Sequence, residues 1–130
     1  MSKNFDLEIK KIVGSTVCDI SNDLEEITIR FSSKAAIQSS FWRILPSEGQ
    51  RFSSFDHMQN YGSVEPIDAV ASLKSKIKDL KVINGECPKL TGDIRLTFEN
   101  GTILEIFNFT ANEVWEVEFE DGTGQYSNYV

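Results

Sequence analysis

The sequence predicts an α+β fold that is mostly antiparallel β-sheet with two helices. Apolar and polar residues alternate in several short runs bounded by turn residues, which is the pattern of half-buried antiparallel strands. Helical spacing of apolar residues occurs twice, near the start and near the middle of the chain. Asn100 and Gly101 separate two alternating runs and form the strongest hairpin signal. With 130 residues, the chain is expected to form a single domain over residues 1–130.

The first half of the chain combines one short helix with several strands. Phe5, Ile9 and Ile12 lie on one helical face, and Gly14 supplies a stop after it. Strands are expected at residues 16–20, 26–31 and 35–45, with a turn at 21–23 between the first two.

The middle of the chain changes character at Pro46. Residues 46–64 are rich in Ser, Gly and Gln, and an irregular stretch of this length in a small domain is often functional or mobile. Pro66 suits the first turn of a second helix, which is expected to end between residues 74 and 79. Further strands are expected at residues 78–84, 93–98, 102–109, 114–120 and 125–129, with turns at 85–88, 100–101 and 121–122. The turn at 100–101 is expected to be of type I′.

The two halves of the sequence share a pattern. Apolar positions in 27–37 match those in 94–104 at a constant offset of 67 residues, and Val17 matches Val82 at an offset of 65. This match suggests a pseudo-repeat of two helix-plus-β-meander units packed together. Two unrelated amphipathic hairpins would align equally well, so both interpretations stay open.

The net charge of −7 limits the classes of partner. Nucleic acids and anionic membrane surfaces attract clustered Lys and Arg, so neither is an expected partner. The first residues lack the apolar core of a signal peptide, and no apolar run is long enough to span a membrane, so a cytoplasmic location is expected. Cys18 and Cys87 form no metal or redox motif and are expected to be thiols.

The acidic residues are distributed unevenly. Residues 96–130 contain no Lys or Arg, whereas residues 1–95 contain all 13 basic residues and 13 acidic ones. Within residues 114–120 the period is two, so alternate side chains are expected on opposite faces of a strand. Trp115, Val117 and Phe119 are predicted to face a core, and Glu116, Glu118 and Glu120 to form a row toward water. Such a row attracts a basic partner, although acidic strands also serve simply to resist edge-to-edge aggregation.

No catalytic motif is visible, so the chain is not expected to be an enzyme. The sequence lacks a nucleophile elbow, a phosphate-binding loop and a dinucleotide fingerprint. His57 is the only histidine, and the adjacent Asp56 would point to the opposite face of a strand. Two cysteines and one histidine do not complete a common zinc site. No cofactor and no metal are expected, although the many carboxylates leave an acid–base pair open.

Trp42 and Arg43 end one predicted strand and allow two interpretations. In the favoured one, Trp42 fills the core while Arg43 pairs with a carboxylate such as that of Asp56. Alternatively, Trp and Arg are typical of binding hot spots. In that case Trp42, Arg43, Asp56 and His57 form a contact site.

Four segments carry a combined pattern: Phe-Trp-Arg-Ile at 41–44, Ser-Phe-Asp at 54–56, the Asn-Gly hairpin at 93–107 and Glu-Val-Trp-Glu at 113–116. This pattern resembles a family of small bacterial proteins. Some of them are similar to immunity proteins of polymorphic toxin and contact-dependent growth inhibition systems. The resemblance covers the chain from Phe41 onward, and its motifs are mainly turn and core residues.

The resemblance implies a non-enzymatic immunity protein that binds a cognate toxin domain one-to-one in the cytoplasm. Many such toxins are nucleases with basic clefts, so the acidic surface would make the contact. The residues expected to bind the toxin are Glu116, Glu118, Glu120 and Asp121, with Glu99 and Glu105 as weaker candidates and residues 46–64 as a rival region. The alternative is a small-ligand or regulatory binding domain. A cavity above roughly 300 Å³ that contains Arg43 and His57 would favour that alternative.

Overall fold

The computed structural model describes residues 4–130 and contains ten strands in two antiparallel sheets. The first sheet has the order β1 (Val17–Asp23), β2 (Glu26–Phe31), β3 (Ala36–Ser39), β9 (Trp115–Glu118) and β10 (Gly124–Tyr126). The second has the order β5 (Phe52–Ser53), β4 (Trp42–Leu45), β8 (Ile103–Ile106), β7 (Ile94–Phe98) and β6 (Val82–Glu86). The helices are α1 (Phe5–Glu8) and α2 (Ala69–Ile77), with 3₁₀ turns η1 (Ile9–Ile12), η2 (Ser54–Asp56) and η3 (Ser127–Tyr129). The predicted α+β, mostly antiparallel fold with two helices is confirmed. Residues 1–3, the start of the segment inspected for an export signal, lie outside the described residues.

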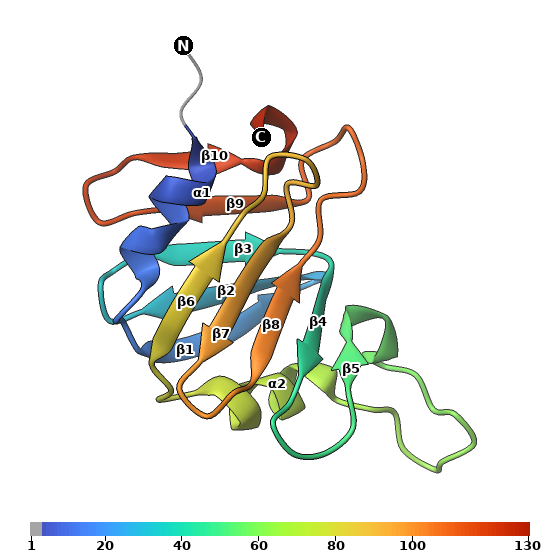
Figure 1. Cartoon of the computed structure of the whole chain (residues 1–130). Helices are drawn as coiled ribbons and strands as arrows, with labels where there is room; N and C mark the ends of the chain where they lie inside the picture. The colour runs from blue at the N-terminus through green and yellow to red at the C-terminus, as the bar shows by residue number, and fades with distance from the viewer. Residues whose placement is uncertain (1–3) are drawn as a thin grey trace.

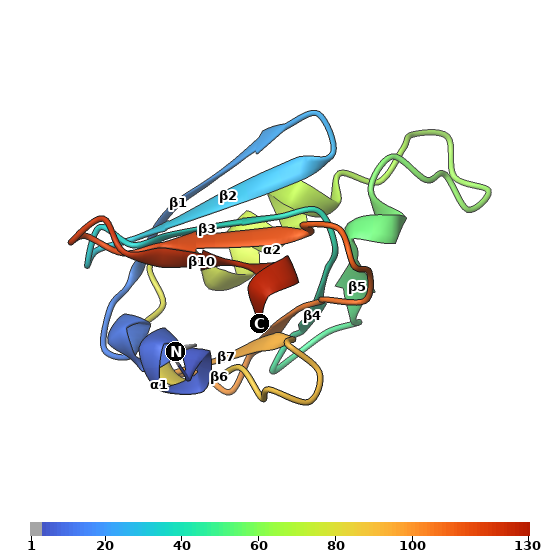
Figure 2. The same cartoon turned by 90° about the horizontal axis from the view of Figure 1, so that it is seen from above.

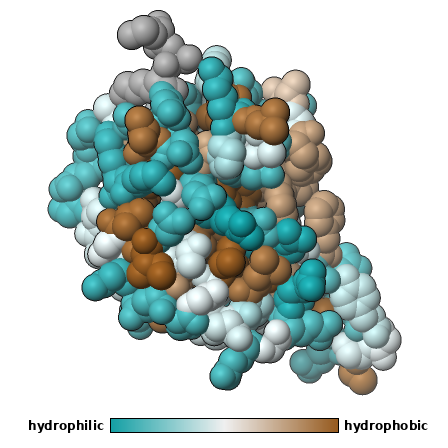
Figure 3. All heavy atoms as spheres, in the orientation of Figure 1, coloured by the Kyte–Doolittle hydropathy of each residue, from teal (hydrophilic) through white to brown (hydrophobic). Residues whose placement is uncertain are grey.

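The two sheets form two layers whose strands cross steeply. In Figure 1 the second sheet lies in front with steep strands, and the first sheet lies behind it with strands that run across the view. Figure 2 shows the layers one above the other. The η1 turn packs against β6, and α2 packs against β1. On the side of the second sheet, polar and apolar residues are interspersed over the surface (Figure 3).

The buried apolar residues form one core that draws on both sheets. Trp42 and Trp115 are its largest side chains and are only 2 % and 1 % exposed. Trp42 therefore fills the core, as the favoured interpretation expected. The alternation predicted for residues 114–120 is confirmed: Trp115, Val117 and Phe119 are buried, Glu116 is half-buried, and Glu118 and Glu120 are exposed.

The single strand expected at residues 35–45 is wrong, because the chain changes sheet in the middle of it. β3 pairs in the first sheet and β4 in the second. At the bend, the buried Ser39 hydroxyl bonds both the N–H and the C=O of Phe41, at 3.2 Å each. Strands that switch sheets at such corners are typical of orthogonally packed sheets. The period of two holds on each side of the corner, but the buried positions shift from Ile37 and Ser39 before it to Trp42 and Ile44 after it, and this shift in phase is the signal that the prediction of one strand overlooked.

The chain crosses back to the first sheet between β8 and β9, beside the first corner. The C=O of Phe41 accepts the N–H of Phe107 (2.9 Å), and the C=O of Val114 accepts the N–H of Ser40 (3.2 Å). The two crossings therefore support each other. As a result, each sheet joins a three-strand meander from one half of the chain to two strands from the other half. The structure does not confirm the pseudo-repeat, which stays a prediction.

The second helix begins later than predicted. Pro66 does not start it, because Ile67 exchanges backbone hydrogen bonds with Met58 and Gln59, both at 2.8 Å, and is held outside the helix. Asp68 then caps the helix by accepting a backbone N–H three residues on, at 2.9 Å. The side-chain cap, and not the proline, therefore determines where the helix begins.

Several other boundaries also differ from the prediction. The turn expected at 21–23 is wrong, because Asp23 pairs with Glu26 and the turn falls at residues 24 and 25. The strand expected at 78–84 starts only at Val82, since residues 78–81 connect α2 to the sheet. The strands expected at 102–109, 114–120 and 125–129 are shorter, and the last one gives way to η3.

The hairpin at Asn100 and Gly101 is confirmed, but its predicted turn type is wrong. A type I′ turn needs positive φ at both residues, whereas Gly101 has a φ of +89° and Asn100 does not share this conformation. The N–H of Phe98 donates to the C=O of Thr102 (2.8 Å), and the N–H of Gly101 donates to the C=O of Phe98 (2.9 Å). These bonds define a three-residue loop with the glycine in the left-handed region.

Candidate functional site

The six acidic residues predicted to bind a partner lie in separate places. Glu116 and Glu118 lie on β9 in the first sheet, Glu120 and Asp121 lie in the turn that follows it, Glu99 lies in the β7–β8 turn, and Glu105 lies on β8 in the second sheet. The structure therefore brings together only some of them.

Glu116 is the centre of a group of carboxylates on the first sheet and in the segment just before β9 that we call the acidic face: Glu26, Glu113, Glu116 and Glu118. Partial burial, and then the negative charge of Glu113, raises the pKa of Glu116. Glu118 and Glu26 act in the same direction, whereas a hydrogen bond from Tyr126 acts against them. The other three carboxylates therefore each disfavour the charged form of Glu116.

One basic residue shares the outer side of this sheet. Arg30 on β2 lies in the same row as Glu118, with Ala36 of β3 between them. A single positive charge does not balance the four carboxylates of the acidic face. The face therefore keeps a net negative charge, which would attract cations from solution or from a partner.

Glu120 and Asp121 lie beside a lysine from the other end of the chain. The Nζ of Lys11 lies 2.7 Å from Glu8 and 3.9 Å from the Asp121 carboxylate, and it also sits 4.9 Å from the Phe119 ring centroid. Asp121 in addition accepts hydrogen bonds from the backbone and hydroxyl of the residue two positions on, at 3.0 and 2.6 Å. The lack of basic residues in 96–130 is therefore partly offset in space.

Glu99 and Glu105 have structural partners. Glu99 accepts the backbone N–H of Lys81 at 2.6 Å, which ties the β7–β8 turn to the start of β6. Glu105 accepts two hydrogen bonds from the Arg43 guanidinium, at 2.6 and 3.0 Å. Through these hydrogen bonds, both carboxylates hold neighbouring strands together.

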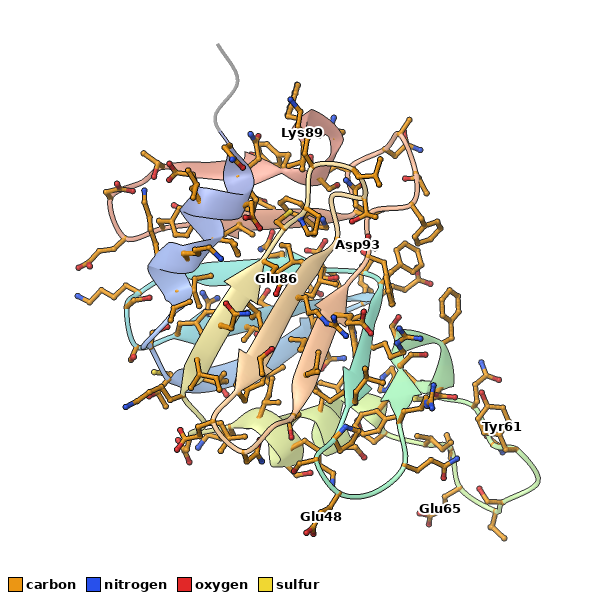
Figure 4. The ribbon with its side chains drawn as sticks, in the orientation of Figure 1. Glu48, Tyr61, Glu65, Glu86, Lys89 and Asp93 are labelled. Carbon is orange, nitrogen blue, oxygen red and sulfur yellow. The ribbon has the colours of Figure 1, made fainter. Side chains whose placement is uncertain are left out.

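Arg43 pairs with a carboxylate as expected, but the partner is Glu105 and not Asp56, the example that was named. Across the second sheet, charges of alternating sign oppose one another in the row Arg43, Glu105, Arg95 and Glu86, the last of which is labelled in Figure 4. Asp56 instead closes the capping box of η2 by accepting the N–H of Ser53 (2.8 Å), and it accepts the hydroxyl of Tyr61 (2.7 Å). The side chains of Arg43 and Asp56 are therefore engaged elsewhere.

Trp42 and His57 line one groove of about 430 Å³ that lies among the β1–β2 turn, the first corner, η2 and α2. The Nδ1 of His57 accepts the N–H of Ala69 (3.1 Å) at the first turn of α2, which assigns the ring proton to Nε2 when the imidazole is neutral. Of the four residues of the alternative contact site, these two alone line the groove.

Six of the residues that line the groove are apolar ones that sequence reasoning did not assign to a site. They are Leu24, Ile27, Phe41, Phe55, Met58 and Val70, and Glu25 and Glu26 add negative charge. Leu24, Phe55 and Met58 are 91 %, 67 % and 63 % exposed. The signal that could have revealed them is the position of large apolar side chains inside predicted turns and loops, where no core face requires them.

The described residues contain few other features that indicate chemistry. Within residues 4–130 there is no group of three or more His, Cys, Asp or Glu side chains arranged for a metal ion. In the same range, no helix has the length and apolar character needed to cross a bilayer. Cys18 is an exposed free thiol and Cys87 a buried one.

Comparison with known proteins identifies no relative of this chain. It matches no protein-family model, no curated protein and no solved structure at a significant level.

Proposed function

We propose that this chain is a non-enzymatic immunity protein that binds a cognate bacterial toxin domain one-to-one and neutralises it in the cytoplasm. The observation that carries the proposal is the acidic face, where the charges of Glu26, Glu113 and Glu118 act on the half-buried Glu116 of the first sheet. The resemblance of the segments around Trp42 and Trp115 to immunity proteins supports the same function.

The repulsion on the acidic face supports a cationic partner. Like charges on one sheet cost folding free energy, and a basic cleft placed against them would relieve that cost. Positive charge near Glu116 would also lower the raised pKa of that carboxyl. Glu120 and Asp121 would extend the contact along the same chain segment, whereas Glu99 and Glu105 are weaker candidates because they serve the fold.

The test is a binding measurement with the C-terminal toxin domain encoded by the neighbouring upstream gene, made inactive by substitution. We expect a one-to-one complex whose association slows at high salt, because screening acts beyond about 8 Å at physiological ionic strength. The double charge reversal Glu116→Lys/Glu118→Lys should weaken the complex by at least about tenfold.

A matched control is the double reversal Glu65→Lys/Asp79→Lys, which changes the net charge equally. Both side chains are exposed, and both lie outside the acidic face and outside residues 46–64. This control should bind the toxin domain as the unchanged protein does. Equal loss of affinity in both variants would show that net charge, and not the acidic face, determines binding. Absence of any complex would contradict the proposed function.

A second candidate, a small-ligand binding domain, is favoured by the groove beside Trp42. Its volume of about 430 Å³ lies within the range of ligand pockets, and His57 lines it. Arg43, which was expected to join it, pairs with Glu105 instead. Native mass spectrometry of the purified protein would reveal a retained molecule, and a retained molecule displaced by Trp42→Ala would favour this candidate.

A further inference from the structure

We infer that the groove beside Trp42 is the docking site for an apolar side chain carried within a basic segment of a protein partner. The inference rests on the proposed function, since the partner that supplies this segment would be the toxin domain. It goes further by assigning a second part of the contact surface and the chemistry of what fills it.

The first observation is the exposure of large apolar side chains in one place. Leu24, Phe55 and Met58 come from the β1–β2 turn and from the segment around η2, yet they line one groove. Phe41 lies at its inner side, with its ring centroid 5.8 Å from that of Phe55. Apolar side chains gathered on the surface of a protein mark interaction sites, whereas single scattered ones do not.

The second observation is that two of these residues have a backbone conformation that is unfavourable for their side chains. Leu24 has a φ of +57° and Met58 a φ of +68°, which is the left-handed region that Gly and Asn adopt at lower cost. Neither side chain reaches the core from there. A requirement at the surface explains their presence better than folding does.

The third observation is the charge around the groove. Glu25 and Glu26 line it, and no Lys or Arg stands among its lining residues. Glu26 also belongs to the acidic face: it lies two residues before Thr28, which shares one row across the sheet with Gln38 and Glu116. The groove therefore adjoins the acidic face. A partner segment could place an apolar side chain in the groove and its Lys or Arg residues over Glu26, Glu116 and Glu118.

Short synthetic peptides test the chemistry directly. The probe has a single Phe flanked by Lys and Gly, and two comparison peptides replace the Phe by Ala or the Lys by Glu. Titration at low salt, followed through backbone amide NMR shifts, should move the signals of Leu24, Phe55 and Met58. The Phe–Lys peptide should bind about tenfold more tightly than either comparison peptide, which corresponds to about 1.4 kcal/mol.

Three results of this titration would overturn the inference. The Phe and Ala peptides could bind equally and move only signals of the acidic face. The Glu-flanked peptide could bind as tightly as the Lys-flanked one. N-acetyl-phenylalanine amide could occupy the groove as tightly as the Phe–Lys peptide, which would make the groove a small-ligand site.

Variants test the same surface in the complex with the inactive toxin domain. Leu24→Asn/Met58→Asn suits the backbone conformation at both positions, so the thermal midpoint should be unchanged or higher. Affinity for the toxin domain should nevertheless fall by at least about tenfold. Phe55→Ala provides a second variant with the same expected direction. The control Leu7→Asn/Leu90→Asn removes two aliphatic side chains that are 64 % and 96 % exposed outside the groove, and it should bind normally.

The outcomes separate this inference from the proposed function. Toxin binding that survives both groove variants but not Glu116→Lys/Glu118→Lys would overturn the inference and leave the proposed function standing. Selective binding of the Phe–Lys peptide in the groove, without any complex with the toxin domain, would support the docking chemistry and contradict the proposed function.

Discussion

Two corners of the molecule are held by similar contacts but are covered differently. At the first corner, between β3 and β4, which we call the open corner, the Oγ of Ser54 in η2 accepts the N–H of Trp42 (3.2 Å). At the second crossing, between β8 and β9, which we call the closed corner, the Oγ of Ser127 in η3 accepts the N–H of Trp115 (3.3 Å). In both cases a serine in a 3₁₀ turn holds the start of a strand that has just changed sheet.

Both indoles are almost fully buried, and the side chains that lie around them distinguish the corners. Phe5 of α1 stacks on Trp115 with ring centroids 5.3 Å apart, and the indole N–H donates to the C=O of Gly92 (3.1 Å). A hollow of about 200 Å³, which we call the closed hollow, is lined by Phe5 and Cys87 but not by Trp115. The groove beside Trp42 measures about 430 Å³, and its wall includes the exposed Phe55.

The difference indicates a division of roles between the corners. At the closed corner, α1 supplies a buried aromatic cover, so the apolar surface is used for folding. At the open corner, the segment between β4 and α2 brings apolar side chains to the surface without covering them. The closed corner therefore serves stability, and the open corner keeps apolar surface available for binding.

Replacing the two tryptophans should have the largest effect. Trp115→Ala should lower the free energy of unfolding by about 5 kcal/mol and Trp42→Ala by about 3 kcal/mol, the two ends of the range for such truncations. The larger loss is expected at Trp115 because it also stacks on Phe5 and binds the C=O of Gly92. Urea unfolding followed by circular dichroism measures both values, and a larger loss at Trp42 would reverse the comparison.

Thiol reactivity should report whether the closed corner stays closed. Cys87 lines the closed hollow, and burial, with the charges of Asp6 and Asp93, raises the pKa of its thiol to about 12. In the native protein we expect iodoacetamide to modify Cys87 at least about a hundredfold more slowly than the exposed Cys18, because the thiolate is the reactive form.

The tryptophan variants provide the controls for this reactivity. Trp115→Ala should expose Cys87 to the reagent, whereas Trp42→Ala should leave it protected in the folded protein. Peptide mass mapping of the modified protein distinguishes the two thiols. Equal rates for both thiols in the unchanged protein would show that the closed corner opens readily.

Replacing Ser127 or Ser54 by alanine should lower the free energy of unfolding by smaller and unequal amounts. Ser127 is 1 % exposed, and its Oγ also accepts the N–H of Val114 at 2.7 Å. Ser127→Ala leaves two buried donors without this acceptor and should cost about 1–3 kcal/mol. Ser54→Ala should cost less, because Ser54 is only half-buried and lies beside the groove. Thermal unfolding of the two variants measures the difference, and equal losses would contradict the comparison.

The acidic face should give the smallest effect, visible as a dependence on pH. The pKa of Glu116 is raised in the folded protein, so its ionisation disfavours the fold. Protonated Glu116 therefore stabilises the fold at low pH, and this stabilisation is lost as the pH rises through and above the ordinary value of 4.5. Glu116→Gln should therefore raise stability at neutral pH by less than about 1 kcal/mol and flatten the pH profile. A loss of stability at neutral pH would contradict this assignment.

The strand pattern could be predicted from the sequence where it depended on neighbours along the chain. The range of β2 matches its prediction, and Trp115, Val117 and Phe119 face inward as their alternation requires. The break between β3 and β4 leaves only a shift in the phase of the alternation, from Ile37 and Ser39 to Trp42 and Ile44, and that shift does not reveal that the two strands pair in different sheets. Alternation specifies which side of a strand is buried but not the sheet to which the strand belongs.

The candidate site was predictable only in part, for the same reason. Glu116 and Glu118 could be expected on one exposed face, since they alternate with buried residues. The pairing of Arg43 with Glu105, the approach of Lys11 to Asp121 and the meeting of Leu24 with Phe55 and Met58 join residues that are distant along the chain.

The sequence by itself therefore determined the class of the fold, the inward-facing tryptophans and the outward row of glutamates. Local periodicity suffices for these, because side chains alternate across every extended strand. Only the tertiary structure decided which charges find partners, which corner is covered by α1 and which apolar side chains meet in the groove. Those outcomes depend on how the two sheets cross and on which segments the crossing brings together.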